Sequence, residues 1–149
     1  MPDHHNRVIS RGRLIALVLW LLFIWGNSLM PGEASSAESG FILQLLRPFI
    51  ELLGIEDLEF AHTVIRKIGH FSEYAVLGVL AWRALGAVRP SLAALIGIAA
   101  PCIDETIQLF VPERVGAIGD VLIDMAGFAL ATAICLLVSR TQRSRSQAE

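Results

Sequence analysis

Ionisable side chains interrupt long apolar stretches at three places in this sequence of 149 residues. Carboxylates and imidazoles can move protons or bind metal ions, whereas lysine and arginine hold phosphates or carboxylates. A spacing of three or four residues between such groups would bring them to one face of a helix. The nine residues that could carry this chemistry are Lys67, His70, Glu73, Asp104, Glu105, Gln108, Arg114, Asp120 and Asp124.

These nine residues divide by chemistry into an acid–base set and a substrate-binding set. The residues assigned to acid–base catalysis are His70, Glu73, Asp104 and Asp124. The residues assigned to substrate binding are Lys67, Glu105, Gln108, Arg114 and Asp120. The four acids Glu73, Asp104, Asp120 and Asp124 could instead bind a divalent metal ion, and a hard cation such as Mg²⁺ would suit this oxygen-rich set better than Zn²⁺ would.

The same residues also have purely structural explanations. Asp120 fits a helix cap, Gln108 a contact between helices, and Arg114 an anchor in the headgroup region. No serine or cysteine of the sequence has an evident base partner, since Ser72 lies on a different helical face from His70. The sequence therefore predicts a shared polar site and leaves open whether that site is catalytic.

The composition is that of a membrane protein. Hydrophobic residues make up 54% and charged residues 17% of the chain, and the mean hydropathy is +0.61. A soluble protein of this size must cover a large surface with polar groups, which this composition does not supply. The sequence has no basic patch of the kind that binds nucleic acid. Cys102 and Cys135 lie in apolar runs without metal-ligand spacing, so we expect them to behave as small apolar residues.

Four apolar runs approach the ~20 residues that a helix needs to cross a bilayer. They are Leu14–Met30, Ile68–Val88, Leu92–Val111 and Val121–Val138. The sequence therefore predicts an all-α integral membrane bundle of four transmembrane helices over residues 14–138, with tails at 1–13 and 139–149. The first run also fits a secretory signal with a cleavage site near Ser36. Its apolar core is longer than the usual ~7–15 residues, which favours a retained helix.

Cations and acids are segregated by these predicted spans. With both termini in the cytoplasm, the outer side and outer halves of the spans hold all acids except Asp3 and Glu149. Lysine and arginine favour the cytoplasmic side of membrane proteins, so the sequence predicts an inner-membrane protein with both termini cytoplasmic. The inner cations are Arg7, Arg11, Arg13, Arg83, Arg89, Arg140, Arg143 and Arg145. The second and third spans are joined on this side by a tight turn predicted at 87–91.

The long outer connection between the first two spans has two parts. Residues 32–40 are small and polar, which predicts an irregular segment. Phe41–Gly54 is apolar at helical spacing but too short to cross a bilayer, which predicts an interfacial helix. A plain loop packed on the bundle is the alternative, because Pro48 weakens the helical pattern.

The acids of three predicted spans fall at one depth below the outer surface. At ~1.5 Å per residue, Glu73, Asp104 and Asp124 lie roughly 8–10 Å down their helices. An isolated charge near the bilayer centre costs about 2.5–3.5 kcal/mol on insertion scales, so these carboxylates must be paired, protonated, hydrated or metal-bound. We expect Arg66, Lys67 and Arg114 to supply the pairing cations.

Three motifs together resemble the VanZ-like family. They are K-x-x-H-F-x-E-Y-A-x-L-G from Lys67, D-E-x-x-Q-x-F-x-P from Asp104, and R-x-G-x-x-x-D-x-x-x-D-x-x-G from Arg114. Asn27-Ser28-x-x-Pro31 is similar to the polar end of the family's first helix. One departure is Glu113, where the family typically has glycine in a P-G-R turn.

The resemblance implies a small bacterial inner-membrane protein of the cell envelope. The name-giving member is linked to resistance to the glycopeptide teicoplanin, as an accessory factor. We therefore expect an outward-facing site that binds or modifies a lipid-linked or cell-wall precursor, with membrane lipid as a partner. The alternative is a non-enzymatic partner or shield protein, or a small proton-coupled carrier.

Overall fold

The computed structural model describes residues 9–86 and 88–146, and the regular structure within them is entirely helical, which confirms the all-α prediction. The predicted tails and the predicted turn at 87–91 lie in part outside the described residues. The elements are α1 Arg11–Ser28, α2 Gly32–Leu52, α3 Leu58–Ala81, a π-helical turn η1 at Trp82–Gly86, α4 Pro90–Gln108 and α5 Ile118–Ser146.

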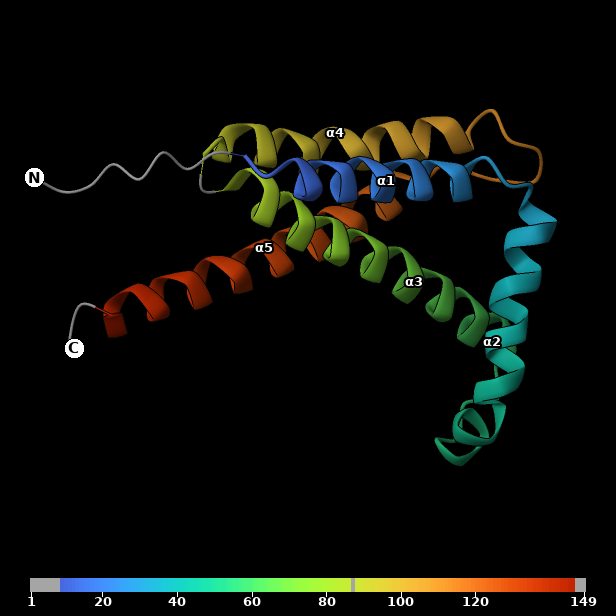
Figure 1. Cartoon of the computed structure of the whole chain (residues 1–149). Coiled ribbons are helices and arrows are strands. Elements are labelled where there is room, and N and C mark those ends of the chain that lie inside the picture. Colours follow the sequence, from blue (N-terminus) through green and yellow to red (C-terminus); the bar gives the residue numbers. More distant parts are fainter. Residues whose placement is uncertain (1–8, 87, 147–149) are drawn as a thin grey trace, which may run out of the picture.

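Four helices form a bundle and α2 lies across one end of it (Figure 1). Successive bundle helices α1, α3, α4 and α5 run in alternating directions along the bundle. The start of α1 and the end of α5 therefore lie at one end, away from α2. The connection from α4 to α5 lies at the end that α2 covers.

Two of the described helices, α4 and α5, are long and apolar enough to cross a membrane alone. The pair α1 and α2 passes the same test only together, with a bend of 104° between the two helices. The 18 residues of α1 include Arg11 and Arg13, which lower its mean hydropathy. The polar residues Lys67, His70 and Glu73 likewise lower the mean hydropathy of α3. By length and composition the described chain therefore has two candidate spans, or three if α1 and α2 count as one bent span.

The core lies where α1, α3, α4 and α5 meet. Its buried side chains include Ile24 of α1, Tyr74 and Leu77 of α3, Ala100 of α4 and Phe128 of α5. The outward faces of the bundle helices are also apolar. This pattern suits helices surrounded by lipid, since an apolar outer face has no need of polar cover there.

The most extensive helix contact is the crossing of α3 and α5, and glycines allow it. A Cβ atom added at Gly127 would lie 2.3 Å from the carbonyl oxygen of Phe71, and one added at Gly78 would lie 2.5 Å from that of Phe128. Small residues at such interfaces let two backbones approach closely. The crossing brings the polar start of α5 against the polar stretch of α3.

The outer connection is more helical than the sequence predicts. The irregular segment predicted at residues 32–40 is wrong, because α2 begins at Gly32 and continues through Pro48. Its alanine and glutamate residues favour a helix, and Glu33 lies in the first turn, where a negative charge suits the helix dipole. The predicted apolar stripe of α2 lies largely exposed, at Phe41, Leu45, Phe49 and Leu52.

A short turn leads from α2 into α3, which starts earlier than the predicted span. Asp57 caps α3, and its carboxylate accepts a hydrogen bond from the backbone N–H of Phe60 at 2.9 Å. Aspartate at this position satisfies a backbone donor that the helix leaves free. Helix α3 therefore projects beyond the predicted outer end of its span and packs against α2.

The glycine crossing generates a stability prediction. Replacing Gly127→Ala should lower the stability of the folded protein by about 1–3 kcal/mol, because the new methyl group collides with the backbone of Phe71. The matched control is Gly119→Ala on the same helix, where an added Cβ meets no atom within 4 Å. Thermal unfolding of both variants in detergent checks this, and equal melting temperatures would contradict it.

Candidate functional site

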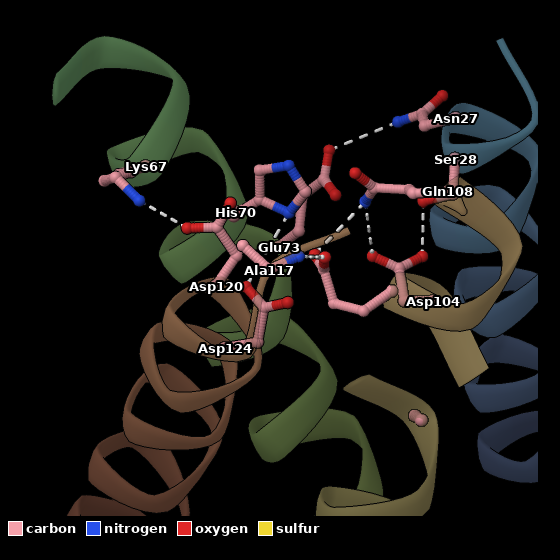
Figure 2. Close-up of polar contacts among 12 residues, drawn as sticks. Asn27, Ser28, Lys67, His70, Glu73, Asp104, Gln108, Ala117, Asp120 and Asp124 are labelled. Atoms are coloured by element: carbon pink, nitrogen blue, oxygen red, sulfur yellow. Dashed lines mark hydrogen bonds and ion pairs between the residues drawn. The ribbon is translucent and has the colours of Figure 1, made fainter. Parts of the chain in front are cut away.

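Four of the nine predicted residues converge where α3, α4 and α5 meet. His70, Asp104, Glu105 and Asp124 each offer a nitrogen or carboxylate oxygen, and these atoms lie within 4.8 Å of one another. Figure 2 shows His70, Asp104 and Asp124 close together at this end of the three helices. The site lies at the end of the bundle where α1 ends and α5 begins. We call these four residues the acidic cluster.

Asp104 is completely buried and is held from α1. The hydroxyl of Ser28, the last residue of α1, donates to Oδ1 of Asp104. The amide of Gln108, one turn along α4, lies 3.4 Å from Oδ2. Pro101 sits within α4 one turn earlier and is itself buried. The end of α1 therefore fixes the orientation of this carboxylate.

Glu105 is held by the connection between α4 and α5. The backbone N–H of Ala117 donates to Oε2 at 2.7 Å, and the Gln108 amide lies 3.3 Å from Oε1. Gly116 lets the connection approach, since an added Cβ there would lie 2.6 Å from the Glu105 carbonyl oxygen. Gln108 thus bridges Asp104 and Glu105 within α4, whereas the sequence predicted that it would make a contact between helices.

Asp124 differs from both, because neither of its carboxylate oxygens has a hydrogen-bond partner among the described residues. Its side chain is fully buried. The Nδ1 atom of His70 lies 3.7 Å from Oδ1, and this nitrogen also lacks a hydrogen-bond partner in the described chain. The two groups face each other inside the acidic cluster (Figure 2).

Glu73, Lys67 and Asp120 surround the acidic cluster without joining it. The half-buried Glu73 accepts a hydrogen bond at 3.2 Å from the side-chain amide of Asn27. Lys67 pairs with Asp120 across the α3–α5 crossing (Figure 2). Helix α5 begins at Ile118, so Asp120 lies inside its first turn and is not the N-cap residue that the sequence suggested. It serves instead as the ion-pair partner of Lys67.

Arg114 has a different environment from the predicted one. Its Nε donates to the carbonyl of Met30 at 3.0 Å and its Nη2 to the carbonyl of Asn27 at 3.0 Å. The expected ion pair with a site carboxylate is therefore wrong. Burial lowers the pKa of the Arg114 guanidinium, and the nearby Asp104 opposes this shift. Its ordinary pKa is so high that it stays charged.

Two adjoining cavities open beside the acidic cluster. Their volumes are about 130 and 160 Å³, and both are lined by Ser35, Arg66, His70 and Arg114. The first also reaches Gln108 and the second reaches Glu73. Helix α2, the stretch of α3 from Ile65 to Glu73 and the α4–α5 connection form much of the walls. The cavities therefore lie between the cationic side chains of Arg66 and Arg114 and the His70 side of the cluster.

The sequence assigned no site role to several residues that the structure brings to the site. Asn27 and Ser28 are single polar residues at the end of an apolar run, and only their likeness to a family motif marked them. Ser35 lay in the segment predicted to be irregular. Arg66 was expected only to pair with acids, whereas it lines both cavities.

The turn that carries Arg114 has an unusual backbone. Glu113 has a φ of 61°, in the left-handed region that favours glycine, at the position where the sequence departs from the expected P-G-R turn. The carbonyl of Pro112 accepts a hydrogen bond from the N–H of Gly32 at 3.2 Å, and the Glu113 carboxylate accepts one from the N–H of Glu33 at 3.2 Å. The turn therefore closes on the start of α2.

Comparisons with known proteins agree with the sequence motifs. The sequence profile of the family described as VanZ/LLP1 matches residues 13–139. A relative from Bacillus subtilis (strain 168), named "Uncharacterized membrane protein YwnJ", is 33% identical over 143 residues, covering 93% of this chain and 95% of the relative. No solved structure matches.

The left-handed turn generates a second prediction. Glu113→Gly should be more stable than Glu113→Ala by about 1 kcal/mol, because both remove the carboxylate but only glycine adopts the left-handed conformation freely. Comparing the two variants removes the contribution of the contact with Glu33 from the difference. Thermal unfolding in detergent measures the effect, and a higher melting temperature for the alanine variant would overturn this account.

Proposed function

The chain belongs to the VanZ-like family of membrane proteins, and we propose that it binds the anionic headgroup of a lipid-linked or cell-wall precursor at the outer face of the bacterial inner membrane. In this proposal α1, α3, α4 and α5 each cross the membrane, both termini are cytoplasmic, and α2 lies in the interface. The acidic cluster then lies in the outer half of the bilayer.

The alternating directions of the bundle helices support this topology (Figure 1). Four crossings return the chain to its starting side, so the cationic ends of α1 and α5 share one side of the membrane. Arg11 and Arg13 lie at one of these ends and Arg143 and Arg145 at the other. Their shared side would be the cytoplasm by the positive-inside rule.

The observation that carries the proposal is the pair of cavities lined by Arg66 and Arg114. Arginine recognises phosphate and carboxylate groups through paired, charge-assisted hydrogen bonds. Each cavity is smaller than the ~300–1,000 Å³ typical of a site for a drug-sized ligand. A headgroup of one phosphate or carboxylate suits this size, while its lipid chain stays in the bilayer.

The exposed apolar face of α2 supports access from the membrane. Phe41, Leu45 and Phe49 are each more than 60% exposed, on the helix that forms one wall of the cavities. A helix with such a face lies at the boundary between headgroups and acyl chains. A lipid-linked group could therefore reach the cavities without leaving the membrane interface.

The proposal is one of binding, with modification of the bound group as a further step that the acid–base residues could serve. The free thiols give little support to a nucleophilic mechanism, since Cys102 is exposed outside the acidic cluster and Cys135 lies further along α5. An accessory role in glycopeptide resistance, or a non-enzymatic shielding role, would both follow from retention of an envelope precursor.

The proposed topology makes a labelling prediction. In a Cys102- and Cys135-free background, a cysteine at Glu56 should react with a membrane-impermeant thiol reagent in intact cells, and one at Ser144 should not. Both positions are exposed, so accessibility to the reagent depends on the side of the membrane. Permeabilised cells should label both. The reverse pattern in intact cells would overturn the orientation.

The proposed ligand makes a binding prediction. Purified protein should bind an isoprenyl phosphate more tightly than the matching isoprenyl alcohol, and Arg66→Gln should weaken phosphate binding about tenfold or more, because a charge-assisted hydrogen bond contributes about 1.5–3 kcal/mol. The control is Arg47→Gln, which removes an exposed arginine that pairs with Glu51 on α2. Equal affinity for phosphate and alcohol, or no effect of Arg66→Gln, would contradict the proposal.

A further inference from the structure

Asp124 is a buried carboxylate in the acidic cluster that accepts no hydrogen bond from the described residues. Its side chain is 0% exposed, and both carboxylate oxygens lack a hydrogen-bond partner among the described residues. A buried carboxylate without a partner is strongly unfavourable. The facing Nδ1 of His70 is also unpartnered, and at 3.7 Å it is too far from Oδ1 for a hydrogen bond.

Two of the cations around the site, Lys67 and Arg114, are engaged elsewhere. Lys67 pairs with Asp120, and Arg114 donates to the last carbonyls of α1. Within residues 9–86 and 88–146, no lysine or arginine lies within ion-pair distance of Asp104, Glu105 or Asp124. Three buried carboxylates therefore share one small space without a bound cationic side chain.

We propose that His70, Asp104, Glu105 and Asp124 together bind one divalent metal ion. Their ligand atoms lie within 4.8 Å of one another, so one ion placed among them can reach all four with little side-chain movement. A single ion would satisfy both oxygens of Asp124 and the facing nitrogen of His70. It would also neutralise most of the charge of the three carboxylates.

The surroundings of the other two carboxylates fit this role. Asp104 is oriented by Ser28, and Glu105 by the N–H of Ala117. Metal-binding carboxylates are commonly fixed by such outer hydrogen bonds, and each oxygen keeps a second lone pair for the ion. Asp104 and Glu105 are thus fixed in position by hydrogen bonds to neighbouring groups, whereas His70 and Asp124 have atoms free to bind the ion.

The ligand set selects the class of metal. Carboxylates suit Mg²⁺, Ca²⁺ and Mn²⁺, whereas imidazole suits Zn²⁺, iron, copper and nickel. One imidazole with three carboxylates and no thiolate therefore favours a first-row ion that accepts both donors, of which Mn²⁺ is the hardest. This changes the expectation of Mg²⁺, which rested on the acids alone. The inference goes beyond the proposed function, because metal binding can be measured without any lipid.

The test is a titration of Mn²⁺ into full-length protein that has been purified in detergent and stripped with a chelator. Loss of the electron paramagnetic resonance signal of free Mn²⁺ should show one ion bound per chain, with nitrogen hyperfine coupling from the imidazole. Asp124→Asn and His70→Gln should each weaken binding by about 10- to 100-fold or more, since even partners of ligands commonly contribute that much. His70→Gln should also abolish the nitrogen coupling.

The matched control is Glu59→Gln, which removes an exposed carboxylate from the first turn of α3 and should leave Mn²⁺ affinity unchanged. Size-exclusion chromatography and circular dichroism establish that each variant is folded. If Asp124→Asn does not fold, the partly exposed His70 still provides the test. Folded wild-type protein that binds no stoichiometric Mn²⁺, or variants that bind it as tightly as wild type, would overturn the inference. Neither result depends on whether an isoprenyl phosphate binds.

Discussion

A carboxylate removed from water must find donors or positive charge, and the polar end of this bundle is organised around that requirement. Asp104, Glu105 and Asp124 are buried within a protein whose outer faces are apolar. Three separate parts of the chain donate hydrogen bonds to Asp104 and Glu105, while Asp124 has no donor among the described residues. The end of α1 supplies Ser28, the α4–α5 connection supplies the Ala117 N–H, and α4 itself supplies Gln108. Because these donors come from different elements, the positions of those elements depend on the carboxylates as well as on apolar packing.

The close approach of α3 and α5 sets the geometry of this end. Gly78 and Gly127 leave no room for side chains where the two backbones cross. One turn from Gly127, Asp124 meets His70 of α3, and one turn further Asp120 meets Lys67. Packing and chemistry are therefore linked along α5, since a change in the crossing would also change the distance between an imidazole and a carboxylate.

Residue type and helical spacing were enough to predict the helical fold and the meeting of acids from different helices at one level of the bundle. Asp104 and Asp124 each stand out as charges within apolar runs, and the rise of a helix places them together with His70. The partners were harder to predict. Ser28 is one hydroxyl at the end of a helix, where such residues are common. The N–H of Ala117 that donates to Glu105 and the carbonyl of Met30 that accepts from Arg114 are backbone groups, which no side-chain type marks in the sequence. The start of α2 was missed because alanine, serine and glutamate occur in both helices and loops, and its contacts with the α4–α5 turn decide between them.

The polar face of α3 has a consequence for how the protein is made. Lys67, His70 and Glu73 lower the affinity of α3 for lipid, and its main packing partner α5 is synthesised after it. On the proposed topology, α3 must enter the membrane before the residues that meet Lys67 and His70 have left the ribosome. The insertion machinery, neighbouring α1 or bound water must accommodate these groups in the meantime. Assembly of the acidic cluster is then a late event in biogenesis, completed only when α5 packs against α3.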